Sequence, residues 1–167
     1  CLVQLSSGDG TAHLVQLNRE NYNAPNLKRV LSDKKCQKIF HFARFDVAVL
    51  KKYLNIDCEP VYCTKIVSKL VRTYTDKHGL KDLCKELINI DLSKQQQSSN
   101  WGARELTEDQ KLYAASDVLY LHQIKDILDQ ELLKLNRRDI ADQCFSFIKT
   151  RVDLDLKGWP DIDIFSH

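Results

Sequence analysis

The 167-residue sequence lacks the features that would place it in a membrane or an export pathway. No apolar run approaches the roughly 18 residues of a membrane-spanning helix, and no signal-peptide pattern is present. Because the chain begins at Cys1 rather than at methionine, we expect its natural N-terminus to lie upstream, so the missing signal carries little weight. An apolar share of 43% and a charged share of 29% are typical of a soluble globular domain with a proper core.

The sequence also lacks a recognisable cysteine site. Its six cysteines form no CxxC pair and no zinc-like pairing with the five histidines. We interpret them as small buried thiols rather than as a disulfide set, which favours a reducing, cytoplasmic location.

Strong charge of one sign is absent as well. The formal net charge of +2 is too small to indicate a nucleic-acid-binding protein by itself, although residues 1–60, 61–104 and 105–167 carry +3, +4 and −5. A basic middle is compatible with one face that follows a phosphate backbone, and equally with ordinary solvated helix faces.

Hydrophobic periodicity predicts one domain over residues 1–167, without internal repeats or a dividing linker. A hairpin with the turn Asp9-Gly10 is expected over 1–17, and further strands at 38–42 and 61–63. Helices are expected at 26–31, 45–54, 64–71 and 79–87, from Thr107 onward as one long helix, and after Asn136 in a pattern through Ile140, Cys144, Phe147 and Ile148. A polar loop over 93–104 has Trp101 as its one large apolar residue.

Two residues of the helix that begins at Thr107 share a face that is otherwise apolar. Thr107 and Gln110 form a capping-box pattern, and Tyr113 and Asp117 follow four residues apart. Asp117 falls within an arc formed by apolar residues between 120 and 128, which directs its carboxylate inward. Since an unpaired buried carboxylate is energetically costly, Asp117 needs a metal, a cation or hydrogen-bond donors. The structural alternative is that Asp117 is a core acid paired with an arginine or capped by backbone donors.

A second acid, Asp46, comes directly after the apolar strand of residues 38–42. On the expected helix 45–54, Val49, Leu50 and Tyr53 repeat at helical spacing, and Asp46 shares their face. Asp46 can also be interpreted as an N-terminal helix acid favoured by the helix dipole. Carboxylates suit Mg²⁺ or Mn²⁺, and two such ions can activate a water for phosphodiester hydrolysis.

The motifs, taken in order, resemble those of one enzyme family. HFARFD (41–46) resembles the second motif of the DEDD 3′-to-5′ exonucleases, and YAASD (113–117) resembles the third motif of their tyrosine-bearing branch. GLKDL (79–83), LSK (92–94) and WGAR (101–104) are similar to the pattern of ribonuclease D. The similarity extends from the start of the chain to about residue 121.

The resemblance implies an α/β, RNase H-like exonuclease fold, in which helices flank a mixed sheet whose first strand is missing from this chain. It implies that Asp46 and Asp117 each bind one of two Mg²⁺ or Mn²⁺ ions, and that Tyr113 orients the attacking water. The implied reaction is hydrolysis of single-stranded RNA from its 3′ end to nucleoside 5′-monophosphates, in processing of tRNA or other structured RNA or in RNA decay.

The sequence departs from the family pattern in several places. No Asp-x-Glu pair of the first motif occurs near the start, so we expect that pair upstream of Cys1 and expect the printed chain to bind metal poorly and to be inactive without it. Phe42 replaces a polar residue that often follows the motif histidine, and Cys63 replaces a non-catalytic aspartate. The helical nucleic-acid-binding domains of longer ribonuclease D proteins have no counterpart after Asn136, which predicts a single exonuclease domain.

Substrate contacts are expected from residues around these motifs. Trp101 is a candidate for stacking on a terminal base or, alternatively, for pinning its loop to the core. His41 on the expected strand is a candidate contact, although a satisfied core histidine is the ordinary interpretation. Arg44 is suited to a phosphate and equally to solvent. Candidates for the RNA backbone are Lys65, Arg72, Lys94 and Arg104.

The leading hypothesis is therefore a metal-dependent 3′-to-5′ exoribonuclease. A DNA exonuclease of the helicase-associated type shares the motifs, and cleavage of matched RNA and DNA strands distinguishes the two. A third hypothesis is an exonuclease-like domain that binds RNA or a protein partner without cutting, which the missing first motif favours.

Overall fold

The computed structural model describes residues 2–18, 20–93 and 95–167. Its strands fall into two small sheets. β1 (Leu2–Leu5) pairs antiparallel with β2 (His13–Gln16), and the Asp9 carboxylate accepts a hydrogen bond from the Thr11 amide in the turn between them. This confirms the expected hairpin, apart from Cys1, which lies outside the described residues.

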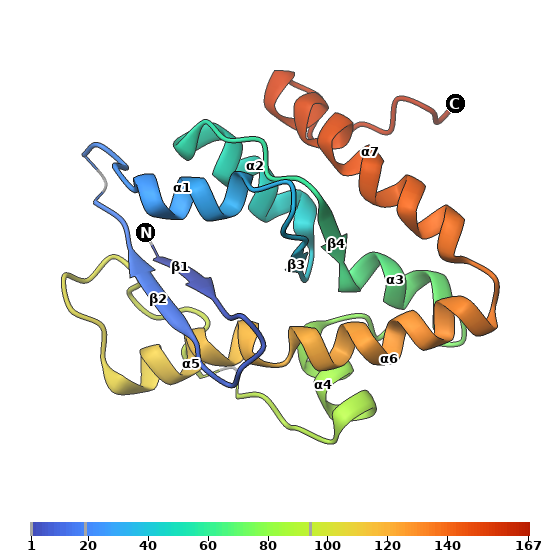
Figure 1. Cartoon of the computed structure of the whole chain (residues 1–167), viewed down its shortest axis with the longest axis horizontal. Coiled ribbons are helices and arrows are strands. Elements are labelled where there is room, and N and C mark those ends of the chain that lie inside the picture. Colours follow the sequence, from blue (N-terminus) through green and yellow to red (C-terminus); the bar gives the residue numbers. More distant parts are fainter. Residues whose placement is uncertain (1, 19, 94) are drawn as a thin grey trace.

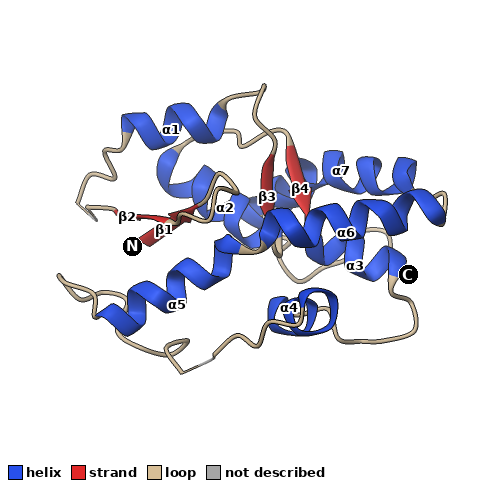
Figure 2. Cartoon of the chain, turned by 60° about the horizontal axis from the view of Figure 1, so that its bottom comes forward, coloured by secondary structure: helices blue, strands red, loops and turns tan. Residues whose placement is uncertain are grey.

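The second sheet is a parallel pair built around one crossover helix. β3 (Lys38–Phe40) leads into α2 (Ala43–Leu54), which returns the chain to β4 (Val61–Cys63) beside β3. Parallel neighbours need such a crossover, so residues 38–63 form a βαβ unit. One mixed sheet was expected; the structure instead holds an antiparallel and a parallel pair, because no strand in the described ranges hydrogen-bonds to both (Figure 2).

Six further helices surround these strands. α3 packs on α6, α2 packs on α7, and the hairpin lies against α5 (Figure 1). In order they are α1 (Pro25–Ser32), α3 (Thr64–Val71), α4 (Leu80–Ile88), α5 (Glu108–Leu119), α6 (Leu121–Lys134) and α7 (Arg138–Lys157). None of the helices in the described ranges is long and apolar enough to cross a membrane.

The single long helix expected from Thr107 is wrong, because the chain breaks at Tyr120. That residue has φ −101° and ψ −3°, ends α5 and begins α6. Its amide bonds to the Val118 carbonyl, and its own carbonyl accepts the first bond of α6 from Ile124. No glycine or proline lies at this break, so it could not be predicted from the local sequence. Asp117 therefore lies on a different helix from the apolar residues that were expected to continue its face.

The predicted buried faces of two other helices were only partly correct: Leu50 of α2 and Ile148 of α7 are buried as expected, but other members of each face are exposed. In α2, Val49 and Tyr53 are 39% and 47% exposed; in α7, Ile140 and Phe147 are 50% and 40% exposed. Each helix instead buries a face that includes an alanine, and the two helices pack together. Small residues let helices approach closely, and the predicted faces had included only larger residues, so the alanines were left out. The buried residues are Ala43, Val47, Leu50 and Leu54 in α2, and Ala141, Phe145, Ile148 and Val152 in α7.

The core lies between the parallel strands, α3, α6 and α7. Tyr62 of β4 is fully buried, packs on Phe145 with ring centroids 4.9 Å apart, and donates a hydrogen bond to Asp129 at 3.0 Å. The cysteines in the described ranges are all free, and Cys58, Cys63 and Cys84 are buried. The expectation of buried thiols without disulfides holds for these three.

Candidate active site

Asp46 lies in the first turn of α2, the helix that connects the parallel strands β3 and β4. β3 ends at Phe40, so His41 is not on the strand as expected; it forms a bend with Phe42, whose backbone is left-handed at φ 73°. The Phe45 amide closes this bend on the Phe42 carbonyl at 3.1 Å. The bend turns the chain into α2 and places Asp46 between the buried and the exposed face of that helix.

Asp117 is positioned by α5 and by the cap at the start of that helix. The expected capping box is present, since Thr107 Oγ1 accepts from the Gln110 amide at 3.2 Å and Gln110 Oε1 accepts from the Thr107 amide at 2.9 Å. The Gln110 side chain also donates to Ser99 and to the Asn100 carbonyl. One glutamine therefore fixes both the start of α5 and the loop that carries Trp101.

The two carboxylates lie near each other without a compensating cation. Burial, with a smaller contribution from the charge of Asp117, raises the pKa of Asp46 to about 6; burial likewise raises the pKa of Asp117 to about 6. Within the described part of the chain, no lysine, arginine or histidine forms a salt bridge with either acid. Both groups are thus held where their charged forms are disfavoured.

Tyr113 shares this environment and contacts the loop before α5. Its ring lies 5.8 Å from the Trp101 ring, centroid to centroid, at 44°. Burial raises the pKa of Tyr113, and the charge of Asp117 raises it further, so the phenol keeps its proton at neutral pH. Trp101 therefore packs against Tyr113, in agreement with the alternative that Trp101 holds its loop to the rest of the domain.

The other candidate contacts have different surroundings. His41 Nδ1 lies 2.9 Å from Thr64 Oγ1, and burial, followed by the nearby Lys65 charge, lowers the pKa of His41 to about 4. His41 is therefore a neutral, hydrogen-bonded histidine. The Lys65 ammonium lies 4.4 Å from the centroid of the Phe42 ring.

Two of the three candidate arginines, Arg44 and Arg72, form salt bridges, and the third, Arg104, is exposed. The Arg44 guanidinium donates to both Asp155 oxygens, at 2.6 and 2.8 Å, which attaches α2 to the end of α7. Arg72 is 3% exposed and its guanidinium binds Glu86, so the prediction that it contacts the RNA backbone is wrong. Arg104 is exposed beside the Trp101 loop, and Lys94 lies outside the described residues.

Three residues around the two acids were not predicted from the sequence to belong to the site. Cys84 of α4 is fully buried. Burial, with a smaller contribution from the charge of Asp117, raises the pKa of the Cys84 thiol to about 11, so the thiol stays protonated near Asp117. Phe42 and Phe45, which both precede Asp46 in the chain, are 46% and 62% exposed. Phe42 was expected in a buried strand, and no sequence pattern indicated that Phe45 lies at the surface.

The chemistry of the acid pair fits a divalent cation, but the pair is not a complete set of ligands. Carboxylate oxygens are what Mg²⁺ and Mn²⁺ prefer, and a bound cation would relieve the repulsion between Asp46 and Asp117. No cluster of three or more possible ligands among histidine, cysteine and acidic side chains occurs in the described ranges. The two acids can therefore form part of a metal site.

A family model of 3′-5′ exonucleases matches residues 1–133. The chain belongs to the 3′-5′ exonuclease family. Among curated proteins it is similar to ribonuclease D of Jannaschia sp., with 28% identity over 140 residues, and to the exosome complex exonuclease RRP6 of Saccharomyces cerevisiae, with 27% over 159 residues. These alignments cover 82% and 90% of this chain but only 36% and 21% of the relatives, so the chain spans about a third or less of their length.

Solved structures of this exonuclease family share the fold. Brucella melitensis NrnC is 53% identical, with a TM-score of 0.96, over all of this chain and 81% of that one. Escherichia coli RNase D is 26% identical, with a TM-score of 0.79, over 96% of this chain and 43% of that one. The expected membership of the ribonuclease D group and the RNase H-like exonuclease fold are confirmed.

Proposed function

We propose that this exonuclease hydrolyses RNA from its 3′ end and releases nucleoside 5′-monophosphates, in a reaction that depends on divalent metal ions. The observation that carries the proposal is the pair of buried, uncompensated carboxylates, Asp46 and Asp117, beside a protonated Tyr113. Family membership supports it, as do the relatives named ribonuclease D and the structure of NrnC with bound Mg²⁺.

Asp46 and Asp117 would supply carboxylate oxygens to two ions. Mg²⁺ or Mn²⁺ held by these two acids would supply Lewis-acid chemistry, which lowers the pKa of a bound water and stabilises negative charge on the phosphate. The Tyr113 phenol would orient the attacking water, because its retained proton lets it donate as well as accept a hydrogen bond. Trp101 holds the Tyr113 ring in place.

The proposed substrates are single-stranded RNA 3′ ends, including very short ones. The solved structure of NrnC bound to pGG, a guanine dinucleotide, supports the short end of this range, and the description of E. coli RNase D as an exoribonuclease in structured RNA processing supports tRNA-like precursors. Residues 1–167 are proposed to act as one exonuclease domain in the cytoplasm, where the buried Cys58, Cys63 and Cys84 would stay reduced.

The test is cleavage of 5′-labelled RNA by the full-length protein with Mn²⁺, beside a DNA strand of the same sequence. A ladder that shortens from the 3′ end is expected, with Asp117→Asn abolishing it and Asp126→Asn, at an exposed position of α6, leaving it unchanged. Preferential trimming of the DNA, or an active Asp117→Asn protein, would overturn the proposal. Binding without any cleavage would favour an inactive exonuclease-like domain.

A further inference from the structure

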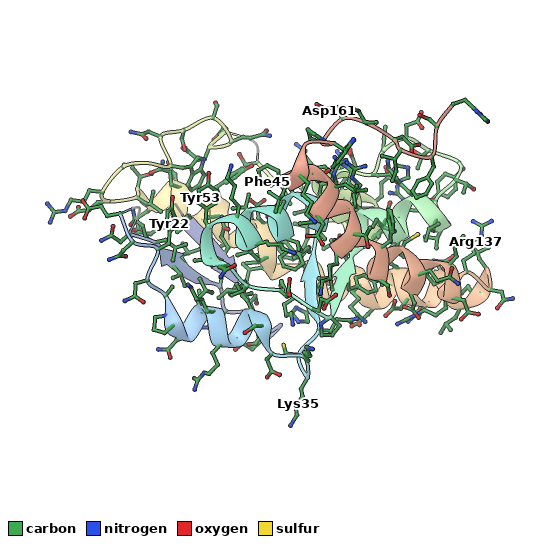
Figure 3. The ribbon with its side chains drawn as sticks, turned by 90° about the horizontal axis from the view of Figure 1, so that it is seen from above. Tyr22, Lys35, Phe45, Tyr53, Arg137 and Asp161 are labelled. Atoms are coloured by element: carbon green, nitrogen blue, oxygen red, sulfur yellow. The ribbon has the colours of Figure 1, made fainter. Side chains whose placement is uncertain are left out.

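An exposed apolar stripe runs along α2 away from Asp46. Phe45, Val49 and Tyr53 are 62%, 39% and 47% exposed, and at about 100° per residue they fall within about 80° of the helix surface. Figure 3 shows Phe45 and Tyr53 on the same side of α2. Asp46 lies between this stripe and the buried face, so the stripe begins beside a candidate metal ligand.

A second exposed phenylalanine, Phe42, lies in the bend before α2, three residues ahead of Phe45. Its φ of 73° and ψ of 47° are in the left-handed region, which bulky side chains rarely adopt. The ring is nevertheless 46% exposed, so core packing does not explain the strained backbone. Strained residues of this kind gather at ligand sites, where the surrounding structure holds them.

Lys65 adds a positive charge to one face of that ring. Its ammonium lies 4.4 Å from the Phe42 centroid and forms no salt bridge with an acid of the described ranges. The neighbouring Arg44 differs, because Asp155 neutralises its charge. An exposed aromatic ring beside a free cation matches a nucleotide, which presents a flat base next to a phosphate.

We propose that Phe42 and Phe45 form a base-stacking platform for the RNA nucleotide immediately 5′ of the scissile phosphate, and that Lys65 contacts a phosphate of that nucleotide. The inference rests on the proposed exoribonuclease function and adds the residues that hold the substrate upstream of the cut. RNA is favoured over a protein partner because the stripe starts at the catalytic acid and carries the unpaired Lys65 at that end.

The experiment uses the full-length protein with Asp117→Asn, so that RNA stays intact. The probe is a 5′-phosphorylated RNA trinucleotide with 2-aminopurine at the middle position, whose fluorescence falls when the base stacks. Phe42→Gly removes the ring without backbone strain, and with Phe45→Ala it should weaken binding by about 5- to 150-fold and abolish the fluorescence loss. Phe42→Tyr keeps a ring and should bind like the parent.

Tyr53→Ala is the matched control, because Tyr53 is an exposed aromatic about 12 Å along the same helix from Phe45. It should leave both RNA binding and cleavage unchanged. Tight binding and a retained fluorescence loss in Phe42→Gly and Phe45→Ala would refute the platform alone. A wild-type protein, without the Asp117→Asn substitution, that neither binds nor cuts RNA would instead refute the proposed function. If Phe45→Ala and Tyr53→Ala both lower the molecular mass in light scattering and leave RNA binding intact, the stripe contacts a second copy of the chain, and the platform is wrong.

Discussion

Replacing Asp46 with asparagine should stabilise the metal-free protein at neutral pH while destroying its proposed activity. The buried carboxylate is charged at neutral pH, lies near Asp117 and has no cation beside it. Asparagine has nearly the same shape but no charge, so it removes the desolvation cost and the repulsion together. Activity is lost because an amide is a poor ligand for a hard divalent ion.

The magnitude follows from the pKa of Asp46, which burial raises from 3.8 to about 6. A raised carboxyl pKa adds stability below the unfolded value of 3.8, and this stability is lost as the pH rises through about 6. About two pKa units correspond to at most about 3 kcal/mol, and partial access to solvent reduces this to about 1–2 kcal/mol. For a chain of this size the gain in Asp46→Asn is about 3–6 °C in Tm at pH 7.5 and close to zero near pH 4.

The assay is thermal and urea unfolding of the full-length protein in EDTA at pH 4 and pH 7.5. Asp126→Asn, which removes an exposed acid, is the control and should change stability at neither pH. Saturating Mn²⁺ should then stabilise the wild type, by about 2.7 kcal/mol at 100 times Kd, but not Asp46→Asn. An Asp46→Asn protein no more stable than wild type at pH 7.5 would refute the reasoning, and an equal gain at both pH values would show a packing effect instead.

Three further substitutions test the surroundings of the acids. Tyr113→Phe keeps the ring that packs on Trp101 but removes the hydroxyl, so single-turnover cleavage should fall by about 100-fold with Tm unchanged, and a large loss of Tm would show a structural role. Gln110→Ala removes the capping box and the hydrogen bonds to the loop before α5, so urea unfolding should show a free energy of unfolding lower by about 1–2 kcal/mol. Limited proteolysis should cut the loop of residues 95–106 faster, and an unchanged rate would show that these hydrogen bonds do not hold the loop. Asp155→Asn weakens the pair with Arg44, so amide exchange after Gly158 should accelerate while RNA cleavage persists; lost cleavage would place Asp155 in the site.

Local patterns predicted the elements around the acids because their signals are short-range. α3 was predicted at its observed bounds, and the Thr107–Gln110 capping box forms as its residues predict. In each case the deciding residues lie within one or two helical turns of one another.

The remaining features depend on contacts between distant residues. Arg44 and Asp155 are separated by 111 positions, and no periodicity links them. The buried faces of α2 and α7 depend on how the two helices pack against each other. The local sequence of one helix does not determine that packing. Burial of Arg72 likewise depends on Glu86 of α4 lying beside it, so the residue looked like a free surface cation.

The bend at His41 and Phe42 connects the proposed chemistry with the proposed substrate platform. Thr64 holds His41 by a hydrogen bond, and the next residue, Lys65, lies over the Phe42 ring, so the start of α3 supports both residues of the bend. The same left-handed turn starts α2, which sets the direction of Asp46 relative to the outward Phe45. Relaxing the bend would therefore displace the proposed metal ligand Asp46 and the proposed stacking surface together. Phe42→Gly, which tolerates the turn, separates the two effects: it should retain metal-dependent stabilisation and lose only the upstream contact with RNA.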